Sequence, residues 1–110
     1  MLAATLLSAP AAQAADKTVN VGPGKTLNPG SWTINPGDTV TWHWVENADH
    51  HIASNPGSLE FWDSGMRGSG DFVHAFQKPG SFSYVCKLHE EMNGTITVAA
   101  AQAEPPLPPR

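Results

Sequence analysis

The chain has 110 residues, which is enough for one small domain. Hydrophobic residues make up 40% of it and charged residues 15%, so the composition is globular and excludes a largely disordered protein. The formal net charge of −4 excludes a nucleic-acid partner, because too few cations are present to neutralise a row of phosphates. Ten glycines and ten prolines indicate many turns and therefore an all-β domain.

Residues 1–15 are predicted to be a signal peptide or its remnant. The segment is rich in small apolar residues, and Ala12-Gln13-Ala14 fits an A-x-A cleavage site. A positively charged n-region is missing, so we interpret the segment as shortened or mis-started, and a disordered Ala-rich extension is the alternative. We therefore expect an exported, periplasmic or otherwise extracytoplasmic protein. No other apolar run is long enough to span a bilayer, so we expect no membrane span.

Residues 16–99 are predicted to form a β-sandwich of two packed sheets. Turn sequences such as Asn35-Pro36-Gly37 recur along this segment and separate short stretches with strand alternation. The absence of helix-period segments between them favours a sandwich. The predicted strands lie at 18–21, 31–34, 38–45, 71–76, 81–86 and 95–98. Residues 100–110 are Pro-rich and are predicted to be a disordered tail, with a linker to a further domain as the alternative.

The only cysteine, Cys86, ends an apolar strand, and in an oxidising compartment it has no internal disulfide partner. Taken alone, it would be interpreted as a buried structural cysteine. His89 and Met92 follow it at intervals of three, so one short loop could supply a thiolate, an imidazole and a thioether. The spacing C-x2-H-x2-M therefore predicts three ligands of one metal site.

A fourth ligand is expected from the adjacent pair His50 and His51. Ile52 should face the core, and in a strand His50 shares its face while His51 points away. We therefore favour His50, although the sequence leaves open whether His51 can replace it. A site made by His50 and Cys86 would join two strands that are far apart in the sequence.

The donor set favours one copper ion per chain. Two imidazoles, one thiolate and one weak thioether are expected for a blue-copper electron-transfer centre. Structural zinc prefers four Cys or His ligands, and catalytic zinc keeps an open position that Met92 would close.

Residues 17–99 resemble the cupredoxins, in the plastocyanin, amicyanin and pseudoazurin group. The matching segments are 36–42, 50–52, 63–65 and 72–98, in the order in which the family carries them. The resemblance implies a Greek-key β-sandwich with a type 1 copper at one end. It also implies that His50, Cys86 and His89 are equatorial ligands, that Met92 is the weak axial one, and that the ring edge of His89 is the electron port.

The sequence departs from the family pattern at three places near these ligands. His51 stands where relatives usually carry Asn or Thr, and Leu88 stands where a proline commonly precedes the second histidine. Glu90 and Glu91 follow His89, where relatives usually have an apolar patch. The first two departures concern the rigidity of the loop, and the third concerns the docking surface.

Two other polar residues are interpreted as structural. Asp63 precedes Ser64 and Gly65, which favours a turn former over a catalytic acid. His74 shares a strand face with two phenylalanines, which favours a packed histidine over a ligand.

We therefore predict a monomeric, non-enzymatic electron carrier that exchanges one electron with redox-partner proteins. Glu90 and Glu91 suggest a partner with a basic docking patch, and an ordinary solvated acidic rim is the alternative. A copper-binding or copper-delivery protein with the same ligands is the alternative function. A fragment of a multicopper enzyme is disfavoured because H-x-H pairs for further coppers are missing.

Overall fold

A computed structural model describes residues 14–100. The predicted signal peptide and tail lie almost entirely outside these residues, and both stay predictions. None of the described residues forms a helix that could cross a membrane. The described part contains eight strands, which are β1 Asp16–Val21, β2 Leu27–Asn28, β3 Ser31–Ile34, β4 Thr39–Trp44, β5 Ile52–Ser54, β6 Asp71–Ala75, β7 Gly80–Cys86 and β8 His89–Val98.

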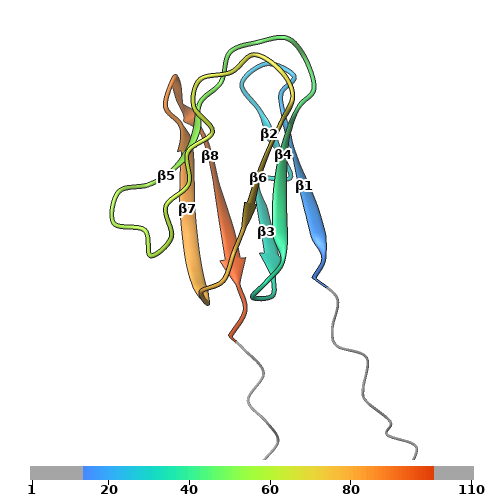
Figure 1. The fold of residues 1–110 in the computed structure, drawn as a ribbon. Helices are drawn as coiled ribbons and strands as arrows, with labels where there is room; N and C mark the ends of the chain where they lie inside the picture. Colours follow the sequence, from blue (N-terminus) through green and yellow to red (C-terminus); the bar gives the residue numbers. More distant parts are fainter. Residues whose placement is uncertain (1–13, 101–110) are drawn as a thin grey trace, which may run out of the picture.

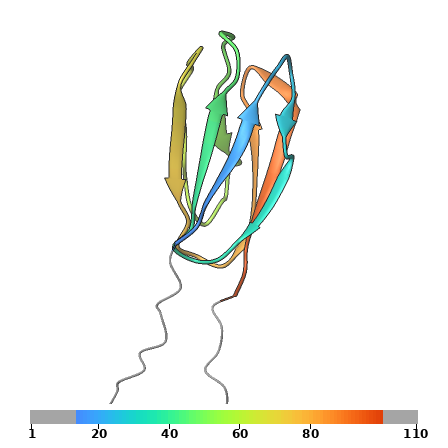
Figure 2. The same cartoon turned by 90° about the vertical axis from the view of Figure 1, so that its right-hand side faces the viewer.

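The strands form two four-stranded sheets that pack face to face (Figures 1 and 2). One sheet has the order β2-β1-β4-β6 and the other β3-β8-β7-β5. Both are mixed, because β1 pairs in parallel with β4, and β3 with β8, while the remaining neighbours are antiparallel. Between β2 and β7 each connection leads from one sheet to the other. The predicted Greek-key β-sandwich is therefore confirmed.

Strand alternation explains which side chains fill the space between the sheets. On β4, Val40, Trp42 and Trp44 are buried, whereas His43 is exposed. On β7, the same alternation buries Phe82, Tyr84 and Cys86. The sheets thus bury matching apolar faces, which is the main driving force for this arrangement.

The centre of the core is aromatic and extends towards Cys86. The ring of Trp42 lies 5.4 Å from that of Tyr84 and 5.9 Å from that of Trp62, measured between centroids. Trp62 belongs to the connection between β5 and β6, yet it is buried among strand residues. Because Tyr84 and Cys86 are two residues apart on β7, they share a face, and the packed core continues directly to the sulfur.

The observed strands differ from the predicted ones at three places. The short strand β2 was not predicted, and β5 covers only Ile52–Ser54, so His50, which was expected on a strand, lies just before it. β8 begins at His89, six residues before the predicted start at Thr95, because Cys86 and His89 pair directly across a two-residue turn. The segment expected to be an open ligand loop is therefore the tip of a β-hairpin.

The end of the sandwich opposite Cys86 is closed by the buried carboxylate of Asp38. Its two oxygens accept hydrogen bonds from the backbone N–H groups of Ala15 and Asn35, each at 2.8 Å. These N–H groups lower the pKa of Asp38, and Lys17 adds to the effect, while burial opposes it. Asp38 thus links the start of β1 to the turn between β3 and β4.

Candidate metal centre

The β7–β8 hairpin contains an irregularity that shapes the candidate ligand segment. Cys86 pairs with His89, but the preceding residue Val85 pairs with Asn93. Residues 90–92 therefore have no pairing partner on β7 and form a bulge. A bulge bends its strand and re-aims the side chains beside it, so His89 need not follow the regular alternation of β8.

His50 is held just before β5 by the backbone of Arg67. The N–H of His50 donates to the carbonyl of Arg67 at 3.0 Å, and the N–H of Arg67 donates back at 3.1 Å. His50 and Ile52 are buried, while His51 between them is only partly buried. The prediction that period-2 alternation sends His50 inward is confirmed by this burial.

The structure brings together three of the four predicted ligand residues. Nδ1 of His50 lies 3.8 Å from Sγ of Cys86, although the two residues are 36 positions apart. Nδ1 of His89 lies 3.7 Å from the same sulfur. The three candidate ligand atoms all lie within 4.8 Å of one another, and among residues 14–100 they form the one such cluster. His50 and Cys86 are buried, and His89 is partly exposed.

These separations fit a single metal ion bound by all three atoms. Metal–nitrogen bonds of about 2.0 Å and a metal–sulfur bond of about 2.3 Å, in a trigonal arrangement, place N and S roughly 3.7 Å apart. The donor set of two imidazoles and one thiolate suits copper. The second ring nitrogen of His50, Nε2, is buried and has no hydrogen-bond partner among the described residues. That ring is thus oriented by its packing and by the contact of Nδ1.

Met92 lies in the bulge of β8, three residues after His89, and its side chain is buried in the hydrophobic core. Met92 thus belongs to the same hairpin as Cys86 and His89, as the predicted axial ligand should. The assignment of Met92 as a ligand stays a prediction.

Three solved structures resemble the chain over most of its length. An oxidised methionine-to-lysine variant of amicyanin has a TM-score of 0.68 at 22% identity, covering 76% of this chain and 81% of that one. The Cu(I) form of a methionine-to-alanine variant of amicyanin has a TM-score of 0.68 at 26% identity, covering 82% and 87%. A purple cupredoxin from Nitrosopumilus maritimus has a TM-score of 0.67 at 24% identity, covering 76% and 100%. The chain has the cupredoxin fold. No family model and no curated protein matches its sequence.

Within this cupredoxin fold, the surroundings of His50 favour its neutral form. Burial lowers the pKa of His50, and the nearby His89 lowers it further. Glu46 and Asp49 act in the opposite direction but do not reverse the shift. A neutral imidazole keeps a free lone pair, which is the form that binds a metal.

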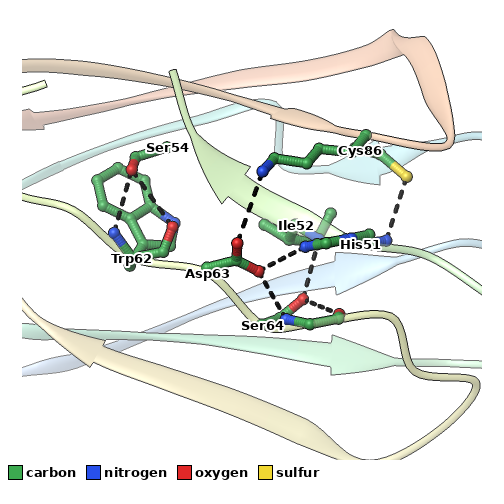
Figure 3. Close-up of polar contacts among 9 residues, drawn as sticks. His51, Ile52, Ser54, Trp62, Asp63, Ser64 and Cys86 are labelled. Atoms are coloured by element: carbon green, nitrogen blue, oxygen red, sulfur yellow. Dashed lines mark hydrogen bonds and ion pairs between the residues drawn. The ribbon is translucent and has the colours of Figure 1, made fainter. Parts of the chain in front are cut away.

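A polar network beside the cluster was not found from the sequence (Figure 3). Nε2 of His51 contacts Oδ1 of Asp63 at 2.5 Å, and Nζ of Lys87 lies 3.6 Å from Oδ2 of the same carboxylate. Asp63 also accepts a hydrogen bond from the N–H of Gly65 at 2.8 Å, so its interpretation as a turn former is confirmed but incomplete. These residues lie far apart in the sequence, and the only signal was the unusual His51.

The neighbours of Asp63 favour the ionised form of its side chain. Burial raises the pKa of Asp63, but the N–H of Gly65, the ring of His51 and the charge of Lys87 together outweigh it. The pKa of Asp63 is therefore below its usual value. The carboxylate of Asp63 is thus a negative charge that His51 and Lys87 contact from two sides.

The acidic residues after His89 are less isolated than the sequence suggested. Oε1 of Glu91 lies 3.2 Å from Nζ of Lys25, which belongs to the connection between β1 and β2. Both side chains are exposed. Of the two glutamates proposed for docking, one is therefore paired with a lysine from another segment, and Glu90 contributes most of the free negative charge.

His74 lies outside the cluster, as expected. It is half-buried, its Nε2 lies 3.1 Å from Oε1 of Glu60, and its ring stacks on Trp62 with centroids 5.3 Å apart. The interpretation of His74 as a packed structural histidine is confirmed.

Proposed function

We propose that the chain is a type 1 copper electron-transfer protein that carries one electron between redox partners. The observation that supports this most strongly is the placement of Nδ1 of His50 and Nδ1 of His89 at 3.8 and 3.7 Å from Sγ of Cys86, at one end of a cupredoxin fold. A bound copper ion would supply the Cu(II)/Cu(I) couple. His50, Cys86 and His89 would hold it, with Met92 as the weak axial ligand.

The protein's own residues would keep this site rigid and dry. His50 and Cys86 are buried, and each is fixed by a strand pairing, to Arg67 and to Ile52 respectively. A rigid ligand set favours electron transfer because little structural change accompanies the change of oxidation state. His89 is partly exposed and is proposed as the point where electrons enter and leave.

The proposed working environment is outside the cytoplasm, and the proposed partners are redox proteins. The free thiol of Cys86 is buried, so its role as a ligand is compatible with an oxidising compartment. The prediction of export from residues 1–15 supports the same location.

The test is the visible spectrum after adding Cu(II) to the metal-free protein. We expect one equivalent of copper to produce an intense thiolate-to-Cu(II) band that disappears on reduction and returns on oxidation. Voltammetry should show a reversible one-electron wave. A protein that binds copper without this band, or that releases copper on each reduction, would contradict an electron carrier and favour copper delivery.

The adjacent histidines provide a matched pair of variants. His50→Ala should lose the charge-transfer band, because it removes a buried nitrogen that faces the sulfur. His51→Ala should keep the band, because the ring of His51 faces Asp63 instead. The reverse result would show that the ligand is His51.

A further inference from the structure

We propose that Asp63 is a positioning residue for the Cys86 thiolate and that it acts through His51. The inference rests on the proposed copper site for its redox consequence, whereas its structural part concerns the metal-free protein as well. His51 makes contacts on two sides, through its backbone towards Cys86 and through its ring towards Asp63 (Figure 3).

The backbone of His51 is bonded to the strand that ends in Cys86. Its N–H points at Sγ of Cys86, with 3.4 Å between nitrogen and sulfur. Its carbonyl accepts a hydrogen bond from the N–H of Lys87 at 2.8 Å. The position of this one residue therefore determines whether a donor points at the sulfur.

The ring of His51 is anchored at the opposite side by Asp63. Nε2 and Oδ1 are 2.5 Å apart, and the two side chains are only 23% and 27% exposed, so water competes weakly for this contact. Since backbone and ring belong to the same residue, fixing the ring also restricts the peptide that points at Cys86.

Asp63 is itself fixed, so it can serve as an anchor. Its backbone forms a bridge with Ala53, and its carboxylate accepts the N–H of Gly65. The next residue, Ser64, forms two hydrogen bonds with the backbone of Ile52. The N–H of Ser64 donates to the Ile52 carbonyl at 2.8 Å, and Oγ of Ser64 accepts from the Ile52 N–H at 2.9 Å. A rigid partner is required for a positioning role, because a mobile carboxylate would transmit no restraint.

Lys87 connects the same carboxylate to the ligand hairpin. Its Nζ lies 3.6 Å from Oδ2 of Asp63, and it follows Cys86 directly. This contact is half-exposed and longer than the His51 contact, so we expect it to contribute less. The carboxylate of Asp63 thus restrains the Cys86 thiolate through two residues, His51 and Lys87, and we expect the contact with His51 to be the stronger restraint.

The expected redox consequence follows from charge. With copper bound, reduction would add one electron to the site, and the N–H of His51 directed at Sγ of Cys86 would stabilise the added negative charge. A well-positioned His51 N–H therefore raises the reduction potential, and a loosened one lowers it.

Two substitutions at the same position separate the contact from the charge. Asp63→Ser keeps a short acceptor for the Gly65 turn but cannot reach His51. Asp63→Asn removes the same charge yet keeps an oxygen that can accept from both His51 and Gly65. Any difference between these two variants therefore reports the contact.

The first measurement is amide hydrogen exchange of residue 51 in the metal-free protein. We expect Asp63→Ser to accelerate exchange about tenfold, because the contact that anchors the His51 ring is lost, while Asp63→Asn keeps an accepting oxygen and stays near the wild type. In a His51→Ala background, the difference between Ser and Asn should vanish. Equal exchange in both variants, or the same difference in both backgrounds, would overturn the proposal. If Asp63→Ser does not fold, His51→Ala alone must show the acceleration.

The second measurement is the reduction potential of the copper-loaded proteins. Asp63→Ser should have a lower potential than Asp63→Asn, although both lack the same charge. Equal potentials would overturn the link to the thiolate. A wild-type protein without a charge-transfer band would instead refute the proposed function, while the exchange experiment would still decide the structural part.

Discussion

An aspartate stabilises each end of the sandwich, but the groups that the two carboxylates hold are different. Asp38 accepts hydrogen bonds from two backbone N–H groups and ties β1 to the turn before β4. Asp63 accepts one backbone N–H, but it also contacts two side chains, His51 and Lys87, that flank the cluster of candidate ligands. The same residue type thus closes the fold at one end and connects to the candidate site at the other.

The partners of each carboxylate therefore decide its role. At the Asp38 end, the donors are backbone N–H groups, and no described side chain near Cys86 takes part. At the Asp63 end, the donors are side chains whose own backbones lie beside Cys86. Substitutions at the Asp38 end should therefore change stability and leave the site intact, whereas substitutions at the other end should change the site more than stability.

The largest expected effect is the loss of the copper chromophore in Cys86→Ser. A hydroxyl provides neither a soft anion nor a thiolate charge-transfer band. The metal-free variant should stay folded, because serine is slightly smaller than cysteine and the β7 pairing is unaffected. Absorption after adding Cu(II), with the amide NMR spectrum as the folding control, tests this. A variant with an intense visible band would rule out Cys86 as the ligand.

The next effect concerns the opposite end and is a loss of stability. Asp38→Asn should lower the free energy of unfolding by about 2 kcal/mol at pH 7, because both N–H groups lose a charged acceptor and one of them then faces the amide NH2, which cannot accept. Denaturant unfolding measures this, and the copper spectrum should match the wild type. A changed spectrum would show that the two ends are coupled.

The same variant has a defined pH dependence. The folded pKa of Asp38 is below its usual value of 3.8, so its contribution is present above that pH and is lost as the pH falls through the lower folded pKa. The stability difference between wild type and Asp38→Asn should therefore shrink between about pH 5 and pH 2. A constant difference would mean that the charge of Asp38 does not contribute.

A smaller effect is expected for Met92→Leu at the metal end. The volume is nearly conserved in a buried position, so the unfolding free energy should change by less than about 1.5 kcal/mol. The reduction potential should rise, because losing a weak thioether donor disfavours Cu(II) relative to Cu(I). Voltammetry measures this, and an unchanged potential would indicate that Met92 does not face the metal.

The smallest effect concerns the acidic surface at the metal end. Electron transfer with a cationic partner should slow as salt rises, because screening weakens steering. Glu90→Gln should flatten this salt dependence more than Glu91→Gln, since Lys25 already compensates Glu91. Stopped-flow rates across an ionic-strength series decide between them. A wild-type rate that is independent of salt would leave both glutamates as a solvated rim.

The sequence by itself determined the all-β class, most of the strands and the candidate ligands. Alternation of apolar residues has a period that depends only on local backbone geometry, so it predicted the buried face of β4 and the inward side chain of His50. The spacing of Cys86, His89 and Met92 is also local, because one short segment carries all three. These features are encoded in neighbouring residues and can be found without a structure.

The tertiary structure decided the contacts between distant segments. Trp62 is buried although it lies outside any strand, and β8 begins at His89 because the hairpin pairs Cys86 with it. The contacts of Asp63 with His51 and Lys87, and that of Lys25 with Glu91, each join segments that are separate in the sequence. No sequence period relates such residues, since their proximity arises only when two sheets pack and bring their connecting loops to the same end.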